Sequence, residues 1–192
     1  MADVLGYAAP RSAAWRHRDV RQGFEVVFLA PGRLEGTTAA VEDGAAWTVR
    51  YVIELEGPWR TRAVRLTGRS QWGPRAVALE ADAAGRWRVD GEAAPHLDGC
   101  LDVDLESSAL TNALPVHRLG LRVGEAADVP AAYVRAADLR VERLDQRYAR
   151  MADTGGRQRY HYAAPRFDFE CELVYDESGL LLDYPGLATR VA

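Results

Sequence analysis

The chain contains no lysine, so all 24 of its basic residues are arginine. It therefore has no amine side chain for Schiff-base chemistry and no lysine for a phosphate-binding P-loop. Asparagine occurs only at Asn112, whereas alanine is abundant. This composition is typical of a GC-rich genome. That origin explains the arginines more simply than selection for bidentate anion binding, which arginine also favours.

Cysteine and long apolar runs are also scarce. The two cysteines, Cys100 and Cys171, form no C-x-x-C pair of the kind that binds a metal, and we expect no metal site and no cofactor. No stretch approaches the ~20 apolar residues of a membrane helix. The segment Met1–Trp15 has no signal-peptide core, because Arg11 interrupts it. We therefore expect no transmembrane segment, a cytoplasmic protein and two reduced thiols.

The chain carries a net charge of −4 over 192 residues. This balance gives no overall attraction to nucleic acid, so we expect no nucleic-acid partner. The length suits one domain, and no low-complexity linker divides it, so the sequence predicts a single domain over residues 1–192. No pattern indicates an oligomeric state.

Apolar and polar residues alternate along most of the chain, which predicts β-strands with one buried face. On 47–55, Trp47, Tyr51 and Leu55 share a face. We expect further strands at 24–29, 33–41, 60–67, 75–81, 86–89, 101–105, 119–123, 139–144, 147–151, 160–163, 167–175 and 180–184. Helix signals are few: Ser107 or Ser108 could cap a short turn, and Asp128-Val129-Pro130 could open a second helix. The predicted class is all-β, a single-domain antiparallel sheet that curls on itself.

Polar residues concentrate between Gly99 and Leu121, which we interpret as a strand-and-turn segment. Asp102 and Asp104 lie two positions apart on one strand, so both project from the same face. Facing inward, they would repel each other and raise the pKa of one carboxyl group into the range of an acid catalyst. Alternatively, they form a solvated outer face while Leu101, Val103 and Leu105 lie in the core.

His117 and Arg118 follow Pro115 in the same segment. Cys100 and His117 could pair as nucleophile and base, but no third partner or glycine-rich elbow supports this, and a free cysteine is commonly a small buried residue. Arg118 could form an ion pair with the two aspartates. The polar group could instead grip a ligand, with Asn112 either in contact with it or serving only as a turn residue.

Two segments share a turn pattern. Asp82-x-x-Gly85 precedes Trp87, and Asp176-x-x-Gly179 precedes Leu180. Aspartate at the first position and glycine at the fourth suit a tight turn between antiparallel strands. This repeated pattern is compatible with a duplicated unit or with two unrelated hairpins.

Several motifs resemble a known family. They are Gly99-Cys100-x-Asp102-x-Asp104-Leu105, Thr111-Asn112-x-Leu114-Pro115-x-x-Arg118-Leu119, Gly57-Pro58-Trp59-Arg60-Thr61-Arg62, Asp82-x-x-Gly85-x-Trp87, Gln146-x-Tyr148 and Asp176-x-x-Gly179-Leu180-x-x-Asp183-Tyr184-Pro185-Gly186. In this order they resemble the bacterial family catalogued as "putative glycolipid-binding", a domain of unknown function. The resemblance implies a spiral β-roll, similar in shape to bacterial lipoprotein carriers, and binding of a lipid or glycolipid. Those carriers act outside the cytoplasm, whereas no export signal is evident here. The family has no established catalytic residues, so none is carried over.

We therefore predict a binding protein that holds an amphipathic lipid or glycolipid in an apolar cleft with a polar rim, where aromatic residues serve for stacking. The candidate rim residues are Asp102, Asp104, Asn112, His117 and Arg118, followed by Gln146 and Tyr148. One alternative is an enzyme acting on a small carbohydrate or acidic metabolite through the paired carboxylates, with His117 assisting. Another is an interaction module in which the same residues form only an ion-pair network.

Overall fold

The computed structural model describes residues 10–192, and residues 1–9 of the expected domain lie outside that part. The first half of the chain forms successive strands. They are β1 (Ser12–His17), β2 (Gln22–Ala30), β3 (Arg33–Glu42), β4 (Ala45–Glu56), β5 (Arg60–Ser70), β6 (Gly73–Ala81), β7 (Trp87–Val89) and β8 (Glu92–Ala93). Each pairs antiparallel with the next, so this half is a continuous meander.

The central segment carries the helical structure and begins the second half. In chain order its elements are η1 (Pro95–Leu97), β9 (Asp102–Leu105), η2 (Leu110–Asn112), α1 (Ala113–Leu119), β10 (Ala126–Asp128), β11 (Ala131–Val134) and β12 (Val141–Leu144). The remaining elements are β13 (Arg147–Thr154), β14 (Arg157–Ala164), η3 (Pro165–Phe167), β15 (Phe169–Tyr175), β16 (Leu181–Tyr184) and β17 (Ala188–Arg190).

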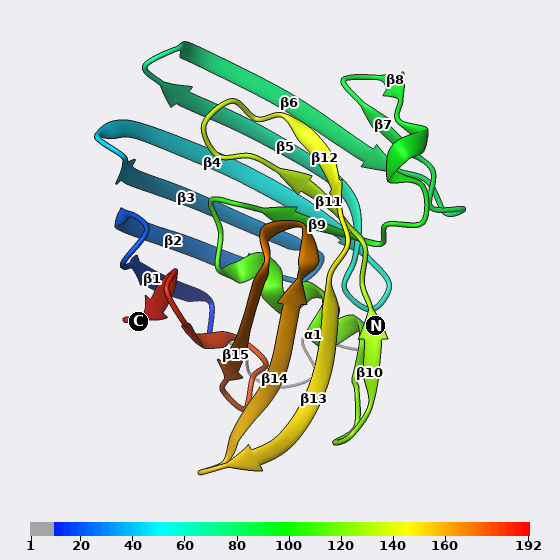
Figure 1. The fold of residues 1–192 in the computed structure, drawn as a ribbon. Helices are drawn as coiled ribbons and strands as arrows, with labels where there is room; N and C mark the ends of the chain where they lie inside the picture. The colour runs from blue at the N-terminus through cyan, green and yellow to red at the C-terminus, as the bar shows by residue number, and fades with distance from the viewer. Residues whose placement is uncertain (1–9) are drawn as a thin grey trace.

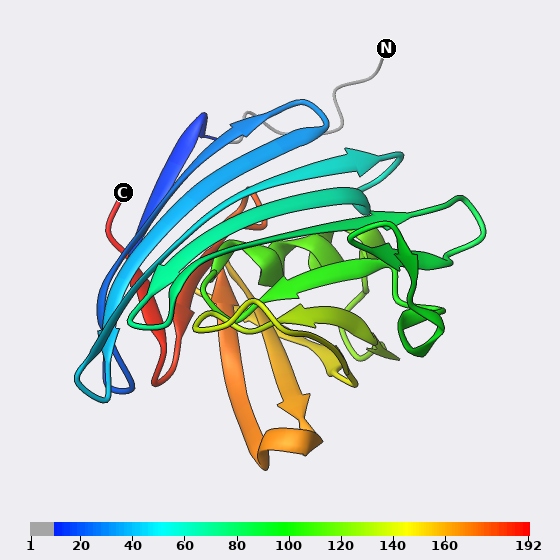
Figure 2. The same cartoon turned by 90° about the horizontal axis from the view of Figure 1, so that it is seen from above.

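The strands assemble into two sheets. β17 pairs with β1, for example Ala188 with His17, so the two halves join into one 14-stranded sheet in the order β10-β13-β14-β15-β16-β17-β1-β2-β3-β4-β5-β6-β7-β8. A second sheet contains β12, β11 and β9, and its β9–β11 pair is parallel. The large sheet curls, and its concave side encloses α1 and the small sheet (Figures 1 and 2). The prediction of an all-β, single-domain antiparallel roll with little helix is confirmed, and the parallel β9–β11 pair is an addition to it.

The alternation of apolar and polar residues along each strand explains why one face of the curled sheet is buried. On β4, Trp47, Val49, Tyr51 and Ile53 are almost fully buried, whereas Thr48 and Arg50 between them are exposed. The buried side chains meet Leu110, Leu114 and Val116 of the central segment in one apolar core. In the part of the chain that is described, no helix is both long and apolar enough to cross a bilayer.

Several local predictions are corrected. Residues 119–123 are not a strand, because α1 runs to Leu119 and Gly120 ends it in the left-handed conformation (φ +54°). No helix opens at Asp128-Val129-Pro130, since β10 ends at Asp128 and β11 follows. The Gly99–Leu121 segment is therefore a strand, a 3₁₀ turn and a short helix rather than strand and turn alone.

Both predicted hairpin turns are present with matching hydrogen bonds. The N–H of Asp82 donates to the Arg86 carbonyl, and the N–H of Asp176 donates to the Leu180 carbonyl. In each turn the aspartate carboxylate accepts the N–H of the residue four positions on. The aspartate thus closes the turn twice, through its backbone and its side chain.

Candidate functional site

A cavity of about 250 Å³ lies on the concave side of the large sheet. Its floor comes from β9 and the η2 turn, and its walls come from β11, β12, β14, β15, β16 and the loops beside them. The lining residues are Val20, Arg21, Asp104, Leu105, Glu106, Ser108, Asn112, Tyr133, Leu144, Tyr162, Ala164, Phe167, Phe169, Tyr184 and Leu187. Most of this wall is apolar or aromatic, and a few polar groups enter it.

Asp104 is the carboxylate at this floor. Its Oδ1 accepts a hydrogen bond from the Thr111 hydroxyl (3.1 Å), and its Oδ2 accepts one from Nε2 of Gln146 (2.5 Å). Burial raises the pKa of Asp104 to about 6, although these two bonds act in the opposite direction. Asp104 can therefore accept hydrogen bonds when ionised, and near pH 6 part of the population can also donate one.

Asn112 is the second polar group of the floor. Its Oδ1 accepts the Tyr148 hydroxyl (2.9 Å), and its backbone carbonyl accepts the Tyr175 hydroxyl (3.2 Å). Its side-chain Nδ2 makes no hydrogen bond within residues 10–192. Asn112 and Asp104 both line the cavity, so the amide group that carries this free donor belongs to the same lining as the carboxylate. Its backbone is right-handed (φ −66°), so the residue is not a left-handed turn asparagine.

Gln146 and Tyr148 hold these two groups in place without lining the cavity themselves. Gln146 Nε2 also bonds the Tyr162 hydroxyl at 3.0 Å, which links Asp104 to the tyrosine cluster. Tyr148 meets Tyr162 edge to face, with ring centroids 5.1 Å apart. Burial raises the pKa of both phenols, so both remain protonated donors at any physiological pH. The sequence-predicted residues Asp104, Asn112, Gln146 and Tyr148 are thus brought together.

Asp102 and Arg118 lie together but do not line this cavity. The guanidinium of Arg118 donates to both carboxylate oxygens, at 3.0 and 2.5 Å, so the suggested ion pair forms with Asp102 alone. Burial raises the pKa of Asp102, while its contacts with Arg118 lower it. Asp102 is 1% exposed, so the alternative of a solvated outer face for both aspartates is wrong. The pair fastens the last turn of α1 to β9.

His117 is also outside the cavity lining. Its ring stacks on Trp59, with centroids 3.8 Å apart and planes 5° from parallel. Burial lowers the pKa of His117 to about 4, so the ring is neutral at pH 7. Cys100 is fully buried, and burial raises the pKa of its thiol to about 11. A neutral ring packed on an indole and a protonated thiol do not make a nucleophile–base pair.

The aromatic wall of the cavity was missed as a unit by sequence reasoning. Phe169 and Tyr184 lie close together with ring centroids 6.1 Å apart, while Phe167 and Val20 at the mouth are 48% and 47% exposed. Arg21 was also missed. It is 6% exposed, lies over the Trp47 ring, and donates to the Glu106 carbonyl at 2.9 Å. Its position between β1 and β2 gave no signal, because its partners Trp47 and Glu106 lie far from it in the chain.

The described part of the chain contains no group of three or more histidine, cysteine, aspartate or glutamate residues placed to hold a metal ion. The carboxylates near the floor instead have separate partners: Asp102 holds Arg118, and Glu106 accepts the Ala136 N–H. The polar groups that line the cavity can form hydrogen bonds, its aromatic and aliphatic wall offers apolar contact, and Asp104 can exchange a proton near pH 6.

Comparison with known proteins gives a family and a fold. The family described as "Putative glycolipid-binding" matches residues 12–190. A crystal structure of a DUF1089 family protein from Pseudomonas aeruginosa is similar, with 33% sequence identity and a TM-score of 0.81, covering 92% of this chain and 95% of that one. A search of curated proteins found no match. The chain therefore belongs to the family described as "Putative glycolipid-binding".

Proposed function

We propose that the protein binds an amphipathic glycolipid-type molecule, with the polar group of the ligand on the floor of the cavity. The observation that carries this proposal is the convergence of Asp104 and the free amide donor of Asn112 inside an otherwise aromatic and aliphatic pocket. Carboxylates and amides suit hydroxyl groups, which both donate and accept hydrogen bonds. The family description supports the same class of ligand.

In this proposal the roles of the seven candidate residues differ. Asp104 and Asn112 contact the ligand, and Gln146 and Tyr148 orient them through the bonds described above. Asp102, Arg118 and His117 act at a distance by fixing α1, which continues directly from Asn112. The two free thiols suit the cytoplasmic location that we propose for the protein.

The size of the cavity limits what it holds. Its volume of about 250 Å³ is below the roughly 300–1,000 Å³ of pockets that enclose a drug-sized ligand. A single polar head group with the first part of its chain fits such a space better than a complete glycolipid. The exposed side chains of Val20 and Phe167 at the mouth offer the remaining chain an apolar path. Each methylene buried there contributes about 0.8 kcal/mol.

An enzymatic role is the second candidate, and the raised pKa of Asp104 favours it. A carboxyl group with a pKa of about 6 in a cleft suits general acid catalysis on a small carbohydrate or acidic metabolite. The paired-carboxylate version loses support, because Asp102 is engaged by Arg118 outside the cavity. An interaction module without any ligand would not need a cavity lined by an unsatisfied amide donor.

Native mass spectrometry of protein purified from its own host, before and after organic extraction, tests the proposal first. An extractable mass excess identified as a lipid or glycolipid is expected. Titration with octyl glucoside, glucose and octanol then separates the contributions of head and tail. We expect octyl glucoside to bind more tightly than either fragment, and Asp104→Ala to weaken it at least about tenfold, whereas Asp128→Ala, an exposed aspartate, leaves it unchanged. A clean apo mass together with no binding of any probe would contradict the proposal.

A further inference from the structure

The convex side of the large sheet carries an ordered set of exposed side chains that the cavity does not use. Strands β1 to β5 pair in direct register, so their outward residues form rows across the sheet. One row is Arg16, Phe24, Ala39, Thr48 and Arg69, read from β1 to β5. Neighbouring members of a row are about 5 Å apart.

An apolar stripe runs along β2 at the centre of these rows. Phe24, Val26 and Phe28 are 53%, 43% and 62% exposed. They alternate with the buried residues Glu25 and Val27, so all three point away from the core. Phe24 and Phe28 are four residues apart, or about 13 Å along the strand. Exposure of three large apolar side chains on one strand to water is energetically unfavourable, and such contiguous apolar patches commonly mark interaction surfaces.

Arginines surround this stripe in excess over carboxylates. The three rows through Phe24, Val26 and Phe28 carry Arg16, Arg50, Arg65 and Arg69 but only one acidic residue, Glu35, which gives a net charge of +3. The whole chain has a net charge of −4. Arg16, Arg50 and Arg69 form no ion pair within residues 10–192, so their charges are available to a partner.

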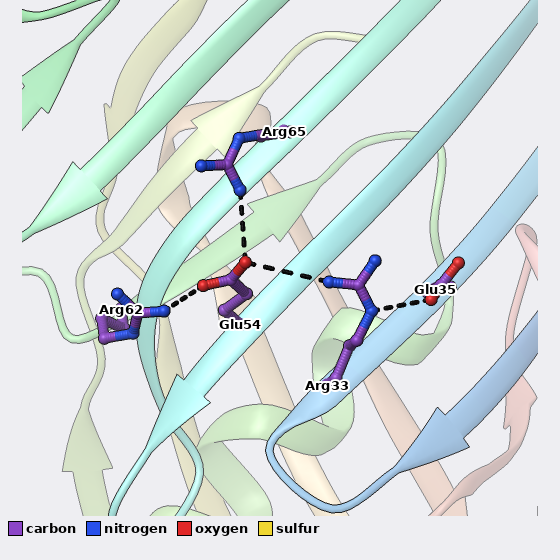
Figure 3. Close-up of polar contacts among 5 residues, drawn as sticks. All are labelled: Arg33, Glu35, Glu54, Arg62 and Arg65. Carbon is purple, nitrogen blue, oxygen red and sulfur yellow. Dashed lines mark hydrogen bonds and ion pairs between the residues drawn. The ribbon is translucent and has the colours of Figure 1, made fainter.

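Positions next to these three rows also carry more arginine than carboxylate side chains. Glu54 on β4 contacts Arg33, Arg62 and Arg65, so three guanidinium groups share one carboxylate (Figure 3). Arg33 also bonds Glu35 at 2.7 Å. Arg65 and Glu35 already belong to the rows counted above, so Arg33, Arg62 and Glu54 together add one further positive charge to this side of the sheet.

Charge and apolar character together select among the possible partners. A second copy of the chain meeting this surface face to face would set +3 against +3, which opposes association. The phosphates of a nucleic acid would pair with the arginines, but a nucleic acid would offer no apolar contact to Val26 or to the rest of the stripe along β2. A bilayer surface with anionic lipids satisfies both, because its phosphates attract arginine and its interfacial region accepts aromatic and aliphatic side chains.

We propose that the convex face of β1–β5, centred on Phe24, Val26 and Phe28 and flanked by Arg16, Arg50 and Arg69, docks on a membrane surface that contains anionic lipid. The surface is separate from the cavity, so this inference does not depend on what the cavity binds. Docking is peripheral: side chains enter the interfacial region while the backbone of the strands stays paired within the sheet.

Sedimentation of the full chain with vesicles tests this docking. Vesicles of phosphatidylcholine with phosphatidylglycerol should bind the protein at low salt, and those of phosphatidylcholine alone should bind it at least about tenfold more weakly, since each arginine near an anionic surface contributes severalfold. Phe24→Ser with Phe28→Ser, and separately Arg50→Glu with Arg69→Glu, should each weaken binding at least about tenfold. Val123→Ser and Arg157→Glu, on exposed positions elsewhere, are the matched controls and should bind like wild type.

Circular dichroism and thermal unfolding establish that each variant is folded. If the folded convex-face variants sediment with anionic vesicles as wild type does, the proposal is overturned. It is also overturned if a DNA or RNA duplex binds more tightly than the vesicles and is lost in the same variants. A dimer in analytical ultracentrifugation that the phenylalanine substitutions dissociate would assign the stripe to self-association instead.

Discussion

The indole of Trp59 and the imidazole of His117 lie face to face, with ring centroids 3.8 Å apart. Trp59 occupies the β4–β5 turn with a left-handed backbone (φ +62°), an unusual conformation for a bulky residue. His117 lies in the last turn of α1, and Gly179 of the β15–β16 hairpin is close to its ring. The stack therefore joins one turn from each half of the large sheet to the helix that leaves Asn112 at the cavity floor.

Gly179→Ala should destabilise the fold strongly. A Cβ at this position would lie 2.6 Å from Cε1 of His117, and the backbone has φ +74°, which alanine tolerates poorly. We expect a loss of about 2–4 kcal/mol in the free energy of unfolding. Urea denaturation measures it. Gly44→Ala is the matched control, because Gly44 has φ +76° but open space around its Cβ, so it should lose only about 1–2 kcal/mol. Equal losses in the two variants would contradict a role for the His117 contact.

The stability of the protein should fall between pH 6.5 and pH 4 in a way that depends on His117. The pKa of His117 in the folded protein, about 4, lies below its usual value of 6.5, so in this range the unfolded chain binds a proton that the folded protein excludes. The contribution is complete above pH 6.5 and is lost as the pH falls, by at most about 3 kcal/mol. His117→Phe keeps a ring on Trp59 but does not titrate. Denaturation of both proteins at pH 7 and pH 5 should show a steeper loss for wild type, and parallel profiles would refute the assignment.

Much of the fold could be predicted from the sequence because its strand pairings are local. The meander from β2 to β6 follows from alternation on each strand and from turn residues between them, such as Gly32 and Gly44, whose φ values are positive. The pairing of β17 with β1 and the parallel pairing of β9 with β11 could not be predicted. Such contacts join segments far apart in the chain and leave no local pattern.

Part of the site could also be predicted, because some of its residues are neighbours in the sequence. Asp104 and Asn112 were grouped because they lie close in sequence, and both line the cavity. The helix over Ala113–Leu119 was missed, because Leu119, Leu121 and Val123 imitate a strand, although Pro115 in a first turn and Gly120 after the last one favour a helix. The aromatic wall from Phe167, Phe169 and Tyr184 required the curl of the sheet, which only the tertiary structure provides.

Arg118→Ala should lower the free energy of unfolding more than the removal of both charges of the ion pair does. Asp102 is 1% exposed and relies on Arg118 for both of its side-chain hydrogen bonds, so the single substitution leaves a buried carboxylate without a cation. We expect a loss of about 3–5 kcal/mol at pH 7. In the double variant Asp102→Asn with Arg118→Ala, much of that loss should be recovered. Urea denaturation of the two single variants and the double variant gives the coupling energy, and simple additivity would contradict a direct pair.

Asp104→Asn should affect the stability of the protein and its affinity for the ligand differently. The pKa of Asp104 in the folded protein, about 6, lies above its usual value of 3.8, so the folded state binds the extra proton between these values. The resulting stabilisation is present below pH 3.8 and is lost as the pH rises through 6. At pH 7 the neutral asparagine avoids the buried charge, so the variant should be at least as stable as wild type, with a gain of at most about 3 kcal/mol.

Ligand binding should respond in the opposite direction to the same substitution. An ionised Asp104 accepts hydroxyl hydrogen bonds, so wild-type affinity for octyl glucoside should rise with pH around a midpoint near 6, which is the pKa of the group that contacts the head group. Asp104→Asn should bind at least about tenfold more weakly at pH 7 and show no such midpoint, since charge-assisted hydrogen bonds are about twice as strong as neutral ones. Titration calorimetry between pH 5 and pH 8 measures both proteins. If the variant is stable at pH 7 yet retains wild-type affinity, Asp104 does not contact the ligand, and its raised pKa is only a consequence of its burial.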